Sequence, residues 1–185
     1  APSVLMRAST LSLPAFMPAA MAARTSGDNA LGSNLPLVPT PMRAAARFVD
    51  RWLVESGQLA RCVRVRAEVF GSLALTGRGH GTDKALLMGL EGHWPHQVDP
   101  DLIPATLARI RAQKTLQLLG SHPIAFDEKT DLVMNKRQKL PFHTNGMRFI
   151  AFDADGATLA TRDYYSVGGG FVVNQDEAAE DRIVA

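Results

Sequence analysis

The residues best suited to chemistry lie in a glycine-rich segment, residues 71–83, which reads Gly-Ser-Leu-Ala-Leu-Thr-Gly-Arg-Gly-His-Gly-Thr-Asp. Glycine lets the backbone approach a ligand closely, and the segment leads into the expected start of a helix, where free N–H groups favour an anion. We therefore expect a carboxylate or phosphate site, with Arg78 adding positive charge. His80 can move a proton near neutral pH, and Asp83 can orient that histidine or bind an ammonium group.

A plain turn explains the same glycine-rich segment equally well. Thr82 or Asp83 would then simply cap the helix that follows. The glycine spacing fits neither the dinucleotide-binding fingerprint nor the P-loop, so neither of those nucleotide sites is predicted. Ser72 has no base placed beside it by the sequence, and no nucleophilic triad is predicted around it.

Two further segments carry polar groups next to glycine. Residues 140–149 read Leu-Pro-Phe-His-Thr-Asn-Gly-Met-Arg-Phe, and in an extended chain His143 and Asn145 would project to the same side and line a pocket. From the residues alone an Asn-Gly turn with an exposed histidine is the preferred interpretation. Residues 164–171 read Tyr-Tyr-Ser-Val-Gly-Gly-Gly-Phe, in which the glycines either present N–H groups to a ligand or end a strand.

The elements that must position these segments indicate an α+β fold with a mixed sheet packed by helices. Thr40 and Pro41 mark a helix start, and alternation over residues 63–69 predicts a strand. We expect a small-residue loop over residues 71–81, and helices after Thr82 and Asp101. Strands are expected at 149–152 and 159–167, around a turn at 153–156. The predicted layout is an irregular tail over 1–39, one domain over 40–173, and a linker or tail over 174–185.

Composition excludes several classes of protein. The net charge of +2 on 185 residues gives no strong field for nucleic acid or for a membrane surface, and no long apolar run predicts a membrane span. The single cysteine, Cys62, permits no internal disulfide and favours a reducing compartment, so a cytoplasmic location is expected. Residues 1–27 have two arginines and no acid, a composition also found in organelle transit peptides. A disordered tail or a gene-model artefact is the alternative for that segment.

Four segments together closely resemble the β domain of iron–sulfur-dependent L-serine dehydratases, in the family's order and spacing. They are Pro41-Met-Arg-Ala-Ala, Phe70-Gly-Ser-Leu-Ala-Leu-Thr-Gly-Arg-Gly-His-Gly-Thr-Asp-Lys-Ala85, Leu140-Pro-Phe-His-Thr-Asn-Gly-Met and Tyr164-Tyr-Ser-Val-Gly-Gly-Gly-Phe-Val-Val173. The resemblance covers residues 41–173 and is more specific than one glycine-rich loop would be. The domain is also similar to an anion-binding regulatory domain of some phosphoglycerate dehydrogenases.

The resemblance implies an ammonia-lyase that converts L-serine to pyruvate and ammonia. In that family a 4Fe–4S cluster sits on three cysteines of a second, α-type half, fused or separate, where one iron acts as a Lewis acid. One cysteine cannot hold such a cluster, so no metal ligand is expected here. By position the resemblance implies catalytic roles for His80, Asp83 and His143. It implies substrate-binding roles for Gly79, Gly81, Thr82 and Asn145. A homodimer is compatible with the sequence.

One departure from the family pattern concerns the stretch before the first helix. The family usually places a serine run and a His-Thr pair there, whereas residues 32–41 contain no histidine. Three interpretations therefore stay open. The chain is one half of an enzyme that needs a cysteine-bearing partner, a serine- or anion-binding regulatory module without catalysis, or a non-functional fragment that lacks an early strand.

Overall fold

The part of the chain that the structure describes begins with a helix. The computed structural model describes residues 38–77 and 79–178, so residues 1–37 of the irregular tail expected over 1–39, Arg78, and residues 179–185 of the expected linker or tail lie outside the described residues. Helix α1 (Pro39–Phe48) continues through a π-helical turn, η2 (Val49–Val54). The helix begins at Pro39 rather than after Thr40, because Pro39 takes the first helical position, where a missing N–H costs nothing. Gly57 ends this unit with a φ of 71°, a conformation that glycine adopts readily.

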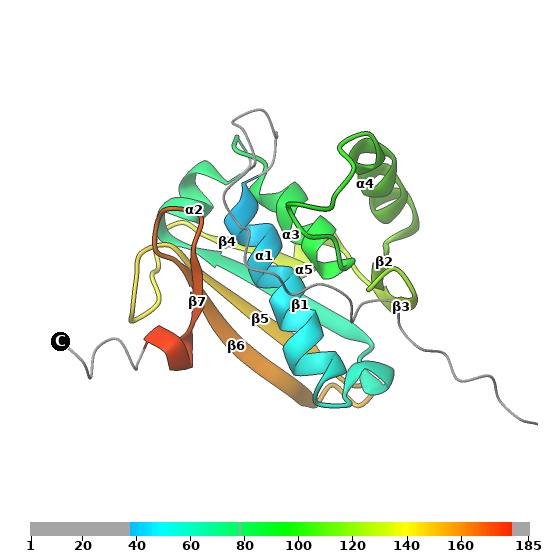
Figure 1. The fold of residues 1–185 in the computed structure, drawn as a ribbon. Coiled ribbons are helices and arrows are strands. Elements are labelled where there is room, and N and C mark those ends of the chain that lie inside the picture. Colours follow the sequence, from blue (N-terminus) through cyan, green and yellow to red (C-terminus); the bar gives the residue numbers. More distant parts are fainter. Residues whose placement is uncertain (1–37, 78, 179–185) are drawn as a thin grey trace, which may run out of the picture. The chain divides into compact units, whose positions relative to one another are not determined.

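A mixed five-stranded sheet forms the centre of the fold, in the order β4-β1-β5-β6-β7 (Figure 1). The strands are β1 (Arg64–Phe70), β4 (Leu132–Asn135), β5 (Gly146–Phe152), β6 (Thr158–Ser166) and β7 (Val172–Asn174). Strand β1 runs parallel to β4 and antiparallel to β5, and the remaining pairs are antiparallel. The predicted hairpin therefore forms as β5 and β6, and the predicted α+β class with a mixed sheet is confirmed.

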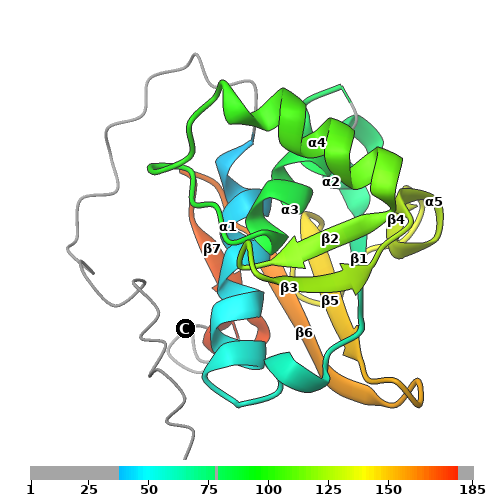
Figure 2. The same cartoon turned by 90° about the vertical axis from the view of Figure 1, so that its right-hand side faces the viewer.

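Helices cover one face of this sheet (Figures 1 and 2). The apolar residues of β1, Val65, Ala67 and Val69, point into the core, and α1 and α3 (Thr82–Leu90) pack above them. Gly89 allows the two helices to touch, since a Cβ there would overlap the carbonyl oxygen of Met42. The start of α3 is thereby fixed relative to α1 and the sheet.

A second, smaller layer lies beyond α3 (Figure 2). Helix α4 (Leu102–Gln113) leads into a two-stranded sheet of β2 (Thr115–Leu118) and β3 (His122–Ala125), followed by α5 (Glu128–Asp131). Buried Glu91 joins this layer to α3, because it accepts hydrogen bonds from Arg109 (2.6 Å) and from the backbone N–H of Gln117 (2.8 Å). The helix after Asp101 was predicted, and Leu107 and Ile110 are buried on it, but the β2–β3 hairpin was not predicted.

Two segments differ in local structure from the sequence expectation. The predicted small-residue loop over 71–81 contains a short helix, α2 (Gly71–Thr76), since Ser-Leu-Ala-Leu is compatible with a helical turn once Gly71 has taken a positive φ. After β7, residues 175–178 are helical rather than irregular. Asn174 caps this turn by accepting from the N–H of Glu177, whose carboxylate accepts from the N–H of Asn174.

Both adjacent tyrosines of β6 are buried, on opposite faces of the sheet. Tyr164 joins the main core, whereas Tyr165 packs in a second cluster with Phe70, Leu140 and Ala178. Burial raises the pKa of Tyr164 to about 12. No helix within residues 38–77 and 79–178 combines the length and apolarity needed to cross a bilayer.

Candidate functional site

Three of the segments singled out by the sequence meet at one end of the sheet. The end of β1, the beginning of β5 and the end of β6 are neighbours there, because Val69 pairs with Met147 and Gly146 pairs with Tyr165. The loop before β5 is pinned on both sides. Ser166 donates its backbone N–H to the carbonyl of Asn145 at 2.9 Å, and Gly71 donates its own to Gln138 at 2.9 Å.

Gly71 is required for this close approach. Its φ is 60°, and a Cβ at this position would overlap the carbonyl oxygen of Thr144. Only glycine meets both the conformational and the steric demand. The start of α2 and the loop that carries His143 and Asn145 therefore lie directly against each other.

A row of hydrogen bonds connects the two predicted histidines. His143 Nδ1 accepts from the backbone N–H of Asn145 at 3.1 Å, and the Asn145 amide oxygen accepts from the hydroxyl of Ser72. The hydroxyl of Thr76 donates to the Ser72 carbonyl at 3.0 Å, and His80 Nδ1 lies 3.1 Å from the Thr76 carbonyl. We call these five residues, 143, 145, 72, 76 and 80, the polar row.

The polar row places the ring proton differently in its two histidines. A carbonyl oxygen can only accept, so the neutral ring of His80 carries its proton on Nδ1 and presents an unprotonated Nε2. In His143 the Nδ1 lone pair is used by the Asn145 N–H, so its neutral ring carries the proton on Nε2. One ring can accept a proton, and the other can donate a hydrogen bond.

Asp83 lies at the start of α3 but is directed toward α4. Its Oδ2 is 3.6 Å from a guanidinium nitrogen of Arg111, and no described residue hydrogen-bonds its buried Oδ1. Glu128 holds Arg111 from the other side at 2.8 Å, and this hydrogen bond raises the pKa of the guanidinium. Within the described residues Asp83 thus pairs with Arg111 and not with His80.

The remaining predicted site residues form the turn between α2 and α3. Gly79 and His80 are exposed, whereas Gly81 and Thr82 are buried. Gly81 has a φ of 72°, and the N–H of Thr82 donates to Gly77 at 2.8 Å. Gly79 also lines a hollow of about 240 Å³ beside Leu75, Met134 and Lys136. The turn therefore leaves one side of the polar row accessible.

Arginines of α1 hold the triple-glycine loop at the same end of the sheet. All three glycines, 168–170, have positive φ. Arg43 donates to the Gly170 carbonyl at 2.6 Å, and Arg47 donates to the Val172 carbonyl at 2.8 Å. Sequence reasoning assigned no role to either arginine. Arg43 and Arg47 are four residues apart and so lie on one face of the helix, and this spacing could have indicated a shared role from the sequence.

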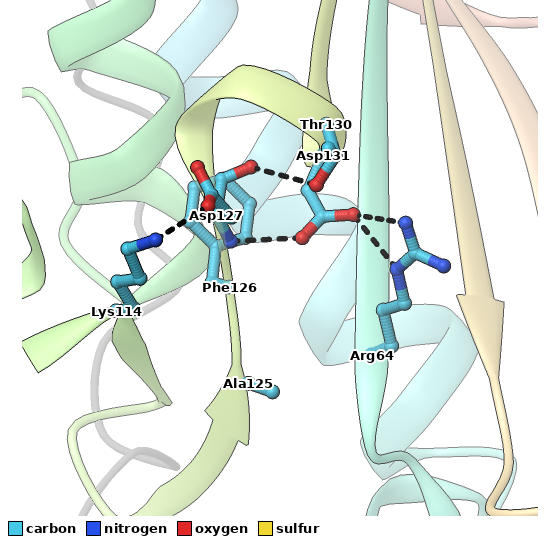
Figure 3. Close-up of a pocket in the computed structure, with 7 residues that line it drawn as sticks. All are labelled: Arg64, Lys114, Ala125, Phe126, Asp127, Thr130 and Asp131. Carbon is cyan, nitrogen blue, oxygen red and sulfur yellow. Dashed lines mark hydrogen bonds and ion pairs between the residues drawn. The ribbon is translucent and has the colours of Figure 1, made fainter.

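A second hollow, of about 270 Å³, lies between β1, β3 and α5 (Figure 3). Its charged groups neutralise one another, because Arg64 pairs with Asp131 at 2.6 Å and Lys114 pairs with Asp127 at 2.9 Å. Hydrogen bonding from Lys114 lowers the pKa of Asp127. Since no group there lacks a partner among the described residues, the polar row is the better candidate site.

The described residues do not fit an iron–sulfur cluster. They contain no cluster of three or more histidine, cysteine or acidic side chains suited to a metal. Cys62 is fully buried, and burial raises the pKa of its thiol to about 11, so it stays protonated. A cubane cluster needs several thiolates.

The fold and the site together define an α+β domain that presents histidine side chains from loops at one end of a mixed sheet covered by helices on one face. Residues 38–177 match the family model described as serine dehydratase beta chain. The chain belongs to this family.

Named relatives agree with this assignment. The chain is 48% identical to an L-serine dehydratase of Streptomyces coelicolor, over 78% of the chain and 31% of that protein. It is 40% identical to L-serine dehydratase 1 of Escherichia coli, over 76% of the chain and 31% of that protein. It is 38% identical to an L-serine dehydratase of Haemophilus influenzae, over 73% of the chain and 30% of that protein. The chain thus spans about a third of the length of these relatives.

Proposed function

We propose that this chain is the β-domain portion of an L-serine ammonia-lyase, which converts L-serine to pyruvate and ammonia together with a cysteine-bearing half. The observation that carries the proposal is the polar row, in which His80 presents a proton acceptor and His143 presents a donor. The relatives named L-serine dehydratase support the choice of substrate. A 4Fe–4S cluster would belong to the cysteine-bearing half.

In this proposal some residues of the polar row transfer a proton and others bind the substrate. His80 Nε2 would take the proton from the α carbon of L-serine, and the His80 imidazolium would return a proton to the departing β hydroxyl, which leaves aminoacrylate and water. Aminoacrylate tautomerises to an imine, and water hydrolyses that imine to pyruvate and ammonia. His143 and Asn145 would donate to the substrate carboxylate, with the N–H groups of Gly79 and Gly81 and the hydroxyl of Thr82 nearby in sequence.

Asp83 would bind the ammonium group of the substrate. Its carboxylate is only partly neutralised, since Arg111 lies 3.6 Å from Oδ2, and the unpaired Oδ1 is buried, so the side chain would have to rotate to present this acceptor to the amine. An anionic group at this place favours a cationic amine over a neutral one. A carboxylate clamp and an ammonium site together would select an amino acid.

Exposed apolar side chains support a docked second half. Leu75, Val167 and Phe171 are 63%, 48% and 66% exposed, and all three lie on the segments that build the site. Exposed apolar groups around a site are typical of an interaction surface. The cysteine-bearing half would cover them and close the site against water.

The test is anaerobic pyruvate release from L-serine by this chain mixed with a cluster-loaded, cysteine-bearing half of a relative. We expect pyruvate above the level of either half alone, and a loss of at least ~100-fold in kcat for His80→Gln. His96→Gln, at an exposed residue far along the chain from the row, is the matched control. Wild-type mixtures that associate and yet release no pyruvate would overturn the proposal.

A serine- or anion-binding regulatory module without catalysis is the second candidate. The observation that favours it is that the whole polar row lies on this chain and needs no outside group to form. Calorimetry with L-serine and with inorganic phosphate separates the two. Binding by the isolated chain without pyruvate release from the mixture would favour this module.

The setting of the enzyme is also a proposal. The single buried thiol supports a reducing, cytoplasmic compartment. L-serine breakdown to pyruvate would place the enzyme in serine catabolism, with pyruvate available for gluconeogenesis. We also propose a homodimer, which light scattering of the mixed halves would test.

A further inference from the structure

We propose that Ser72 is a positioning residue, which fixes the side-chain amide of Asn145 so that its NH2 group faces the ligand. The ligand class follows from the donors and is a carboxylate. This inference rests on the proposed function only for the identity of that carboxylate as L-serine. The contact between Ser72 and Asn145 lies within this chain and does not depend on the cysteine-bearing half.

The backbone holds Ser72 and Asn145 against each other. Gly71 and Thr144, their neighbours in sequence, are in direct contact, and the Gly71 N–H donates to Gln138 at 2.9 Å. The carbonyl of Ser72 is occupied by the Thr76 hydroxyl at 3.0 Å. The Ser72 hydroxyl is therefore presented to Asn145 by a rigid support rather than by a free loop.

The hydrogen bonds of Asn145 leave one group for a ligand. Its backbone N–H donates to His143, its backbone carbonyl accepts from Ser166, and its amide oxygen accepts from Ser72. No described residue accepts from its NH2 group. Since an amide rotated by 180° would turn its oxygen outward and repel a carboxylate, the direction of the Ser72 hydroxyl bond decides what Asn145 can bind.

The free side-chain groups of Asn145 and His143 are both donors. The NH2 group of Asn145 offers two N–H bonds, and the neutral ring of His143 offers Nε2–H. Donors without an acceptor select an anion with at least two oxygens, such as a carboxylate. Ser72 itself is not a nucleophile in this arrangement, because its proton is donated to an amide oxygen, which is not a base.

The first test is nitrogen-15 relaxation of the Asn145 side-chain NH2 in the full chain, without ligand. We expect an order parameter near the rigid value of ~0.85 in the wild type and in Ser72→Thr, which keeps the hydroxyl. Ser72→Ala should lower it below ~0.6. Ser56→Ala is the matched control, since the Ser56 hydroxyl bonds only its own helix, at the Trp52 carbonyl. An unchanged Asn145 amide in folded Ser72→Ala would overturn the proposal.

The second test uses the pyruvate assay of the mixed halves. Ser72→Ala should raise KM for L-serine by about 10-fold, equivalent to one lost charge-assisted hydrogen bond, and leave kcat within about 3-fold. Ser72→Thr should restore KM. A fall in kcat with KM unchanged would contradict a positioning role. If the wild-type mixture makes no pyruvate, the proposed function fails, and the relaxation measurement still decides the role of Ser72.

Discussion

Asp83 and Arg111 form an ion pair in which the carboxylate is buried and the guanidinium is shared, with 3.6 Å between Oδ2 and the nearest nitrogen. The Asp83 side chain is 12% exposed, and the Arg111 side chain is 44% exposed. Arg111 is held in turn by two hydrogen bonds to Glu128. The pair therefore ties the start of α3 to α4 and α5.

Arg111→Ala should destabilise the fold by about 1–2 kcal/mol, because it leaves a buried carboxylate without its cation, although solvent at the exposed arginine reduces the effect. Adding Asp83→Asn should recover part of that loss, since a neutral amide needs no counter-charge. Urea unfolding of the two single variants and the double variant measures the coupling. Strict additivity of the two changes would show that the ion pair contributes nothing.

Gly71→Ala should destabilise the fold by at least ~2 kcal/mol more than Gly57→Ala does, because a Cβ at Gly71 meets the Thr144 carbonyl. The comparison is matched, since Gly57 also has a positive φ, yet nothing lies within 4 Å of its added Cβ. Gly57→Ala should therefore show only the backbone strain of ~1–2 kcal/mol. Thermal unfolding of both variants measures the difference, and equal losses would mean that the contact is not rigid.

Cys62 should make the protein lose stability in alkali. The thiol has a pKa of about 11 in the fold against 9.0 when exposed, so the unfolded chain loses its proton first. Its contribution is complete below pH 9 and declines as the pH rises toward 11, by about 1.4 kcal/mol for each pH unit.

The comparison that isolates Cys62 is urea unfolding of the wild type and of Cys62→Ala at pH 8 and at pH 10. The wild type should lose about 1.4 kcal/mol more over this interval than the variant does. Both proteins keep Tyr164, whose raised pKa affects them alike. Equal losses in the two proteins would mean that the thiol ionises as easily in the fold as in the unfolded chain.

Asn174→Ala should cost about 1 kcal/mol, because it removes the side-chain oxygen that accepts from Asp176 and Glu177. Asn174→Ser keeps a capping oxygen and should lose much less. Chemical denaturation followed by tryptophan fluorescence compares the two. If the serine variant is as unstable as the alanine variant, the packing of Asn174 beside β6 matters and the cap does not.

Local patterns were sufficient for much of the fold. Strand β1 was visible in the sequence because its buried and exposed residues alternate. The turn between β5 and β6 was visible because the two paired strands are close in sequence. The β2–β3 hairpin was not predicted, since its turn places Leu119, which rarely takes a positive φ, at 53° beside Gly120. Helix α2 was missed because it has only six residues, with Gly71 at its start and Gly77 directly after its end.

The candidate site was only partly visible in sequence for a similar reason. His80, His143 and Asn145 were found from their residue types. Ser72 was set aside, because its partner is 73 positions away and only the contact of Gly71 with Thr144 brings them together. The direction of Asp83 toward Arg111 depends on the packing of α4, which no local spacing reveals.

The place of β1 in the sheet sets the order in which the chain can fold. Val69 of this strand pairs with Met134 on one side and with Met147 on the other. As the chain leaves the ribosome, β1 must therefore wait, with both edges unpaired, for more than sixty residues to follow. Contacts so distant in sequence slow folding and leave an edge open to other chains. The early half of this chain should consequently depend on chaperones until β5 has been made.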